Sequence, residues 1–317
     1  MKVPTFNHVE ELKDKFHVIT MISNPMRFDS RYVLYQQFKD HMEQTGVVHF
    51  HTIEIQQGDR EFQVTSANNP YDIQLRTKDA MWIKENAINI AIQRLTPEWK
   101  DWKYVAWIDA DIHFVNPNWV QECIEELQVN HFLQLFQSAI DLGPNGESLK
   151  MHNSFMYCYW NNLPASKKYQ DWHPGFAWAA TREALNSVGN LIEGAIVGSA
   201  DRHMAAALIG KGLETVPATM TNDYKDMVAS WEKRAVEDIR FRVGYMKGTI
   251  LHDWHGKKKD RGYADRWQIL VKHNYSPYKH VFKDTQGLLQ FDKDALYLAK
   301  DIKKYFMSRN EDSIDLV

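Results

Sequence analysis

Hydrophobic residues along the chain follow two periodicities, and these predict strands and helices in regular succession. Residues 17–22 form an apolar run that is typical of a buried strand, and Ser23-Asn24-Pro25 ends it. Between residues 30 and 45, apolar side chains recur at helical spacing, and a second strand is expected near 47–55. A strand, a helix and a strand in this order predict a parallel sheet, in which ligands gather at the carboxyl ends of the strands.

The pattern continues along the chain and predicts one α/β domain with a mostly parallel central sheet flanked by helices. No internal repeat or low-complexity linker divides it. A helix should follow Asn116-Pro117, with the asparagine as its cap and the proline as its first residue. The other expected elements are helices at 79–95, 226–242 and 260–272 and strands at 104–108, 131–136, 151–160 and 248–252.

The composition is that of an ordinary globular protein, with 317 residues, 44% hydrophobic and 25% charged, and a formal net charge of -3. No apolar run approaches the length of a membrane span, and the first residues lack the apolar core of a signal peptide. Cys123 falls on a helix stripe and Cys158 in an aromatic strand, so both are expected to be buried and reduced. These features predict a cytoplasmic protein that does not bind membranes.

The strand at 104–108 ends in two carboxylates, Asp109 and Asp111, which are separated by one small residue. In an extended segment, residues i and i+2 point to the same side, so the two carboxylates are expected to converge on one hard cation. Ala110 between them leaves room for a ligand. The arrangement suits a metal-bound diphosphate, although a capped and solvated turn also explains such a pair.

Trp107-Ile108-Asp109-Ala110-Asp111 resembles the Asp-x-Asp signature of metal-dependent glycosyltransferases with the GT-A nucleotide-sugar fold. Residues 172–185 resemble the glycine-aromatic stretch of these enzymes, and residues 248–256 resemble their late segment with a metal-binding imidazole. The spacing His-Gly-x4-Arg-x-Tyr-x2-Arg from His255 to Arg266 is similar to that of bacteriophage-type cytoplasmic transferases. The resemblance implies one GT-A-like domain with a nucleotide-sugar donor half at 1–145, an acceptor and catalytic half at 146–285, and a C-terminal helix and acidic tail at 286–317.

The resemblance also implies a metal ion, Mn²⁺ or Mg²⁺, held by Asp109, Asp111 and an imidazole. His252 ends the apolar strand and is the preferred ligand, with His255 as the alternative. In the inverting enzymes that the chain resembles, an acid from the region of Asp201 is the general base. The residues alone also explain Asp201 as a first-turn acid of a helix that Ser199 caps. His203, on the same turn, is the nearest competitor for the role of base.

Donor and acceptor contacts are implied by the same resemblance, and each has a structural alternative, such as an exposed turn, a solvated helix face or an inward-packed ring. Gly175 permits close approach of a ligand, and an indole ring provides a platform for a sugar. The candidate donor contacts are Ser23, Asn24, Arg27, Lys84, Asp109, Arg261, Tyr263 and Arg266, with Asn89 as a further possibility; the candidate acceptor contacts are Trp172, Gly175 and Trp178.

The predicted activity is sugar transfer from a nucleotide diphosphate donor, a UDP-sugar, to an acceptor hydroxyl. Nine Lys or Arg residues between Lys247 and Lys283 are interleaved with aromatic residues, and such a surface can follow a phosphate backbone and stack a displaced base. The resemblance to bacteriophage-type enzymes implies hydroxymethylated pyrimidine in DNA as an acceptor. It is slightly favoured over a bacterial surface-glycan precursor because no lipid-seeking segment is visible. A sugar nucleotidyltransferase is the alternative from another class, but the segment from Ser23 to Arg27 is not the glycine-rich triphosphate loop that such enzymes use.

Overall fold

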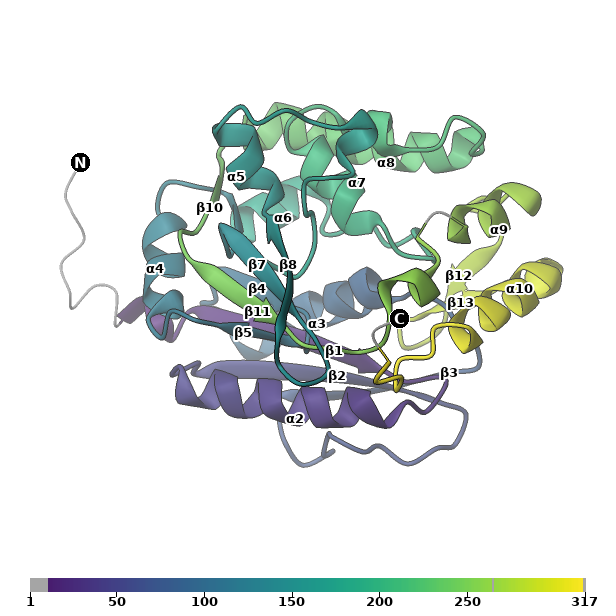
Figure 1. The fold of residues 1–317 in the computed structure, drawn as a ribbon, viewed down its shortest axis with the longest axis horizontal. Coiled ribbons are helices and arrows are strands. Elements are labelled where there is room, and N and C mark those ends of the chain that lie inside the picture. Colours follow the sequence, from purple (N-terminus) through teal and green to yellow (C-terminus); the bar gives the residue numbers. More distant parts are fainter. Residues whose placement is uncertain (1–10, 264, 316–317) are drawn as a thin grey trace.

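A seven-stranded sheet forms the centre of the computed structural model, which describes residues 11–263 and 265–315 (Figure 1). Its strand order is β10-β6-β9-β4-β1-β2-β3, and β9 alone among these strands runs against its neighbours. The expected fold class, a single α/β domain with a mostly parallel sheet between helices, is confirmed. The strands are β1 (Phe16–Ser23), β2 (His49–Gln57), β3 (Asp72–Thr77), β4 (Tyr104–Ile108), β6 (Phe132–Gln134), β9 (Ala177–Thr181) and β10 (Val243–Tyr245).

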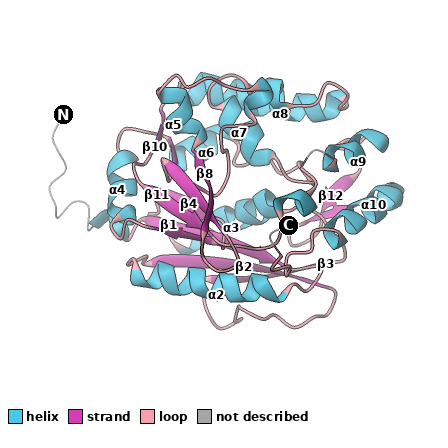
Figure 2. Ribbon diagram, in the orientation of Figure 1, coloured by secondary structure: helices cyan, strands magenta, loops and turns pink. Residues whose placement is uncertain are grey.

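Helices cover both faces of this sheet (Figure 2). Side chains of a strand alternate between its two faces, and in β4 Val105 and Trp107 join the hydrophobic cluster of α3, while Ala106 and Ile108 join that of α2 and α4. The core therefore has two layers, one on each face. The helices are α2 (Asp29–Gln44), α3 (Lys84–Glu98), α4 (Trp119–Glu126), α5 (Phe155–Trp160), α6 (Arg182–Val188), α7 (Ala200–Ala207), α8 (Asn222–Arg234), α9 (Arg266–Lys272) and α10 (Leu296–Met307).

A second, four-stranded sheet connects the two halves of the chain. It has the order β5-β11-β7-β8, and a two-stranded ribbon of β12 (Val281–Lys283) and β13 (Leu289–Phe291) lies apart from it. In the antiparallel pair of β5 and β11, His252 lies opposite Ile112. The turn after β4 and the end of β11 are therefore neighbours. The strands are β5 (Ile112–Phe114), β7 (Ser138–Leu142), β8 (Ser148–Asn153) and β11 (Thr249–His252).

The aromatic segment 151–160 is not one strand, as its composition had suggested. The strand β8 ends at Asn153, and α5 begins at Phe155 because the Ser154 hydroxyl caps it by accepting the Tyr157 N–H at 3.2 Å. The helical turn buries Phe155, Met156 and Cys158, so tertiary packing overrides the strand propensity of the aromatic residues. Cys158 lies on this helix rather than in a strand, and both cysteines are buried and free, as expected.

Several helix boundaries also differ from those expected. The helix after β5 is capped at Asn118, because the Asn116 side chain accepts the Asn118 N–H and holds a turn before it, so Pro117 is not the first helical residue. The helix expected at 79–95 begins at Lys84, and the helix expected at 226–242 begins at Asn222. The latter ends at Arg234, followed by a π-helical turn over Ala235–Ile239.

The helix expected at 260–272 is two pieces, a 3₁₀ turn over Lys258–Arg261 and α9. Gly262, at φ 53°, separates them, because this left-handed conformation interrupts a right-handed helix. Within the described residues, no helix is both long enough and apolar enough to cross a membrane.

A pair of buried histidines in the sheet should make the free energy of unfolding depend on pH. His17 Nδ1 and His51 Nε2 lie 2.8 Å apart, and burial together with the neighbouring imidazoles lowers the pKa of His17 to about 2 and that of His51 to about 3. The unfolded chain binds a proton on each ring as the pH falls through 6.5, whereas the folded chain does not. The pair therefore lowers the free energy of unfolding as the pH falls, by about 1.4 kcal/mol per histidine at one pH unit below that value.

Urea unfolding at pH 7.5, 6.5 and 5.5 measures this slope. The double variant H17L/H51L replaces both partners by apolar side chains and should lose less stability over this range than the wild type, by roughly 3 kcal/mol at pH 5.5. Equal pH slopes for the two proteins would mean that the pair takes up protons in the folded state.

Candidate active site

A cavity of about 1010 Å³ opens at the carboxyl ends of β1 and β4. The loop before β9 reaches the same edge because β9 runs in the opposite direction, and the end of β11 borders the cavity from the second sheet. The location agrees with the expectation for a parallel sheet. The residues singled out in the sequence that line the cavity are Ser23, Lys84, Asp109, Asp111, Trp172, Gly175, Asp201, His252, His255, Arg261, Tyr263 and Arg266.

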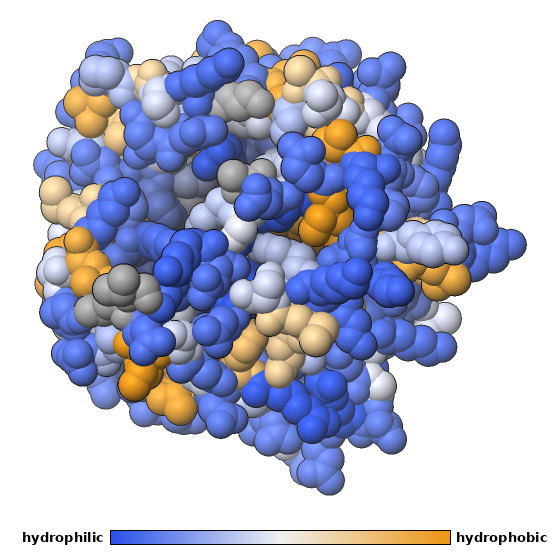
Figure 3. Space-filling model, turned by 45° about the vertical axis from the view of Figure 1, so that its right-hand side comes forward, coloured by the Kyte–Doolittle hydropathy of each residue, from blue (hydrophilic) through white to orange (hydrophobic). Residues whose placement is uncertain are grey.

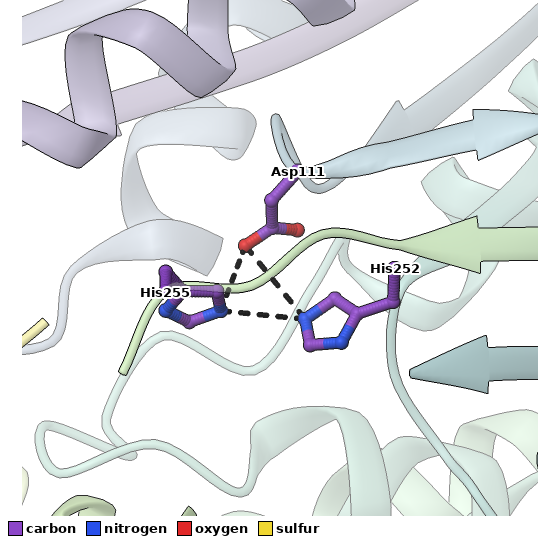
Figure 4. A group of neighbouring side chains, drawn as sticks. All are labelled: Asp111, His252 and His255. Carbon is purple, nitrogen blue, oxygen red and sulfur yellow. Dashed lines mark hydrogen bonds and ion pairs between the residues drawn. The ribbon is translucent and has the colours of Figure 1, made fainter. Parts of the chain in front are cut away.

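Three of these side chains converge on one point (Figure 4). Asp111 lies in the turn between β4 and β5, His252 ends β11, and His255 lies in the loop that follows. Asp111 Oδ2 lies 3.1 Å from His255 Nε2 and 3.9 Å from His252 Nε2, and the two Nε2 atoms are 3.3 Å apart. Both histidines, which the sequence offered as alternatives, therefore belong to the same group.

The group has the chemistry of a metal site. Asp111 Oδ1 is buried and accepts no hydrogen bond from the described residues, so it is an acceptor that still needs a partner. Burial and the charge of Arg261 lower the pKa of His255 to about 4, so this imidazole is neutral at neutral pH, the form that binds metals. Two imidazoles and one carboxylate fit Mn²⁺ better than Mg²⁺, which prefers oxygen ligands in octahedral geometry.

Asp109 does not join this group. Its Oδ1 accepts a hydrogen bond from Lys84 Nζ at 2.6 Å, and Lys84 is the first residue of α3. Burial raises the pKa of Asp109, and the ammonium opposes that shift. The two carboxylates of the Asp-x-Asp motif thus have different partners, an ammonium for Asp109 and two imidazoles for Asp111.

Two buried arginines lack a carboxylate partner. Arg261 and Arg266 are 6% and 8% exposed, and neither forms an ion pair with any carboxylate in residues 11–263 and 265–315. Both have a buried Nε without a hydrogen-bond partner in this part of the chain. Arg266 Nη2 donates to Ser199 Oγ at 2.6 Å, and Arg261 Nη1 lies 3.4 Å from the Tyr263 hydroxyl. Buried cations without anions mark an anion-binding position.

Asp201 reaches the cavity through the space that Gly175 leaves. A Cβ atom on Gly175 would lie 2.7 Å from Asp201 Oδ2, so any larger residue would displace the carboxylate. Ser199 precedes α7 at φ 83°, and its hydroxyl does not cap the helix as expected, because it accepts the bond from Arg266 instead. Glu85, which the sequence did not single out, also borders the cavity, and burial raises its pKa to about 7.

Other candidates from the sequence lie outside this cavity, and most of their side chains bond other parts of the protein. The Asn24 side chain is engaged with the backbone of Phe28, and Arg27 does not line the cavity. Asn89 bonds the backbone of Leu191. The remaining two are buried: Trp178 donates its indole N–H to Pro174, and His203 is held between Thr215 and Tyr224.

Two charged groups near the cavity were not predicted from the sequence. Glu311, in the C-terminal tail, is 1% exposed and accepts hydrogen bonds from Arg31 of α2 at 2.5 and 2.7 Å. Asp141 of β7 bonds His252 Nδ1 at 2.8 Å. No local signal identifies either group, because each depends on partners more than 100 positions away in the chain.

Most basic residues of the segment 247–283 are paired with carboxylates or buried. Five of its nine basic residues pair with carboxylates, and two more are the buried arginines. Figure 3 shows a predominantly hydrophilic face on which hydrophobic residues are scattered in small groups. The five pairs are Lys257–Asp315, Lys258–Asp141, Lys272–Asp301, Lys279–Asp223 and Lys283–Glu193.

Comparison with known proteins finds no matching family model and no matching curated protein. Among solved structures, a mutant of Drosophila β1,4-galactosyltransferase 7 in complex with manganese, UDP-Gal and xylobiose is similar with a TM-score of 0.41 and 12% identity, over 89% of this chain and 97% of that one. A proposed nucleotide-diphospho-sugar transferase from Desulfovibrio desulfuricans has a TM-score of 0.32 and 10% identity, over 93% and 98%. Both TM-scores lie below 0.5, so the likeness carries no weight for function.

The group of Asp111, His252 and His255 predicts a Mn²⁺ site that mutation can test. Asp111→Asn and His255→Gln should each weaken Mn²⁺ binding by more than about 100-fold, because loss of a direct ligand exceeds the loss typical of an outer-shell partner. Electron paramagnetic resonance of free Mn²⁺ during titration measures the dissociation constant. His131→Gln, outside the cavity, is the control. Wild-type affinity in the Asp111 and His255 variants would exclude this group as the site.

Proposed function

We propose that the protein is a metal-dependent glycosyltransferase that moves a sugar from a nucleoside diphosphate donor to an acceptor hydroxyl. One observation carries this proposal: a group of side chains that could hold a metal ion borders the same cavity as two buried arginines that pair with none of the described carboxylates. A sugar nucleotide brings a diphosphate that satisfies both. UDP is the nucleotide that the resemblance to GT-A enzymes implies.

The donor diphosphate would lie between Asp111 and the arginines. Arg261 and Arg266 would donate hydrogen bonds to its oxygens. A guanidinium can donate two parallel hydrogen bonds, which suits phosphate oxygens. When bound to Asp111, His252 and His255, a divalent ion supplies positive charge that stabilises the leaving diphosphate. Lys84 would hold Asp109 in place beside the donor, and Ser23, at the end of β1, is the nearest candidate for a nucleotide contact.

Asp201 would act as the general base. Its carboxylate would take the proton of the acceptor hydroxyl while the hydroxyl oxygen attacks the anomeric carbon and the bond to the diphosphate breaks. The proton then resides on Asp201, and the electron pair of the broken bond leaves with the diphosphate. Gly175 supports this role because it leaves the space that the carboxylate occupies. Trp172, which is 6% exposed at the cavity wall, is the remaining aromatic candidate for acceptor contact.

The alternative class, a sugar nucleotidyltransferase, differs in the bond that breaks. Such an enzyme joins a nucleoside triphosphate to a sugar phosphate and releases pyrophosphate, whereas the proposed enzyme releases a nucleoside diphosphate. The short loop after β1 has a single polar turn at Asn24 rather than a glycine-rich triphosphate cradle. Pyrophosphate release would favour this alternative.

Removing the base gives a direct test of the assignment. Asp201→Asn should lower kcat by about 100- to 10,000-fold, because the amide cannot accept the acceptor proton. Release of UDP from a panel of UDP-sugars in the presence of Mn²⁺ measures the rate, and the KM for the donor should change little. Asp40→Asn, on the exposed face of α2, is the control. An unchanged kcat for Asp201→Asn would exclude Asp201 as the base.

The acceptor is tested separately with hydroxymethylated DNA and with sugar acceptors. Most cations of segment 247–283 are held in ion pairs, which leaves few of them for contacts with a phosphate backbone. We therefore expect transfer to a sugar acceptor. The KM for this acceptor should change little between 50 and 200 mM salt. A DNA acceptor that uses several phosphate contacts would instead lose affinity steeply over this range, by roughly 1,000-fold for six contacts. Transfer to DNA with such a slope would establish the phage-type acceptor.

A further inference from the structure

Asp141 is a buried carboxylate that none of the proposed steps uses. It lies near the end of β7, directly opposite His252 in the parallel pair of β7 and β11, and it is 5% exposed. Its carboxylate bonds three side chains from three different elements, His152 of β8, His252 of β11 and Lys258 of the 3₁₀ turn. The Lys258 ammonium supplies a positive charge beside this carboxylate.

The two oxygens of Asp141 divide these partners between them. His152 Nε2, at 2.5 Å, and Lys258 Nζ both bond Oδ2, and His252 Nδ1 bonds Oδ1 at 2.8 Å. The two donors on Oδ2, the His152 imidazole and the Lys258 ammonium, orient the carboxylate. Oδ1 is therefore directed at one ring nitrogen of His252.

This contact decides the state of the His252 ring. A carboxylate only accepts hydrogen bonds, so the nitrogen that faces it, Nδ1, carries the proton, and Nε2 keeps its lone pair. Nε2 is the atom that faces Asp111 Oδ2 at 3.9 Å and His255 Nε2 at 3.3 Å. The ring thus presents a free lone pair to the ligand group of Figure 4.

We propose that Asp141 is a positioning residue for the metal site, which fixes the orientation and tautomer of His252 and raises its basicity as a ligand. An outer-shell carboxylate on the second nitrogen of a metal-bound histidine has this effect in general. The inference rests on the proposed function, because it requires that Asp111, His252 and His255 hold a metal ion.

The experiment measures Mn²⁺ affinity rather than activity. Asp141→Ala should raise the dissociation constant about 10- to 100-fold, and Asp141→Asn should lie between it and the wild type, since an amide oxygen still accepts the His252 proton without the charge. A matched control exists on α10: Asp301 also bonds a lysine and a histidine, Lys272 and His273, and Asp301→Ala should leave the dissociation constant unchanged. Thermal unfolding in metal-free buffer verifies that each variant is folded.

The outcomes separate this inference from the proposed function. Wild-type Mn²⁺ affinity in folded Asp141→Ala would overturn the inference and leave the metal site standing, whereas absence of Mn²⁺ binding by the wild type would overturn both. If Asp141→Ala does not fold, ¹⁵N resonances of the histidine rings in the metal-free wild type provide the test, with His252→Gln to assign the signal. A proton on Nδ1 of His252 supports the inference, and a proton on Nε2 overturns it.

Discussion

The antiparallel pairing of β5 with β11 is the contact on which the site depends. The chain leaves the central sheet at Ile108 and enters the second sheet at Ile112, and the turn between them carries both carboxylates of the Asp-x-Asp motif. Because Ile112 lies opposite His252, the carboxylate before β5 and the imidazole at the end of β11 lie at one place. A shift of one residue in this register would turn His252 to the opposite face of the sheet.

Some charged side chains around the cavity are paired with an opposite charge, and others are not. Lys84 neutralises Asp109, Arg31 neutralises Glu311, and Lys258 neutralises Asp141, which also bonds two histidines. These partly buried pairs link α2 to the C-terminal tail and α3 to the turn after β4. Among the groups without such a pair in the described residues are Asp111, with one unpartnered oxygen, and the buried arginines Arg261 and Arg266. A metal ion would complement the free oxygen of Asp111, and a diphosphate would complement the two arginines. The unpaired charges therefore indicate which ligand the cavity can bind.

The apolar pattern predicted the α/β fold and the edge of the sheet at which the cavity lies, because its period depends on neighbouring residues. The segments that border the cavity were expected from the resemblance. The sequence did not predict the separation of Asp109 from Asp111. The rule that residues i and i+2 share a side holds for a strand, but these residues lie in the turn after β4, where the rule does not apply. For the same reason the pairs of Asp141 with His252 and Arg31 with Glu311 were missed, since they are created by the packing of distant elements.

The reversed strand β9 explains how residues 174–176 reach the edge of the sheet at which the acidic turn lies. In a purely parallel sheet, the loop that precedes a strand lies at the amino edge, away from the site. Since β9 runs antiparallel to β4 and β6, residues 174–176 lie at the carboxyl edge instead, where the backbone N–H of Asp109 bonds Phe176 O at 2.8 Å. Gly175 is thereby fixed next to the acidic turn, and its missing side chain admits the carboxylate of Asp201. The direction of β9 therefore places Gly175 beside the acidic turn, and Asp201 of α7 occupies the space that Gly175 leaves.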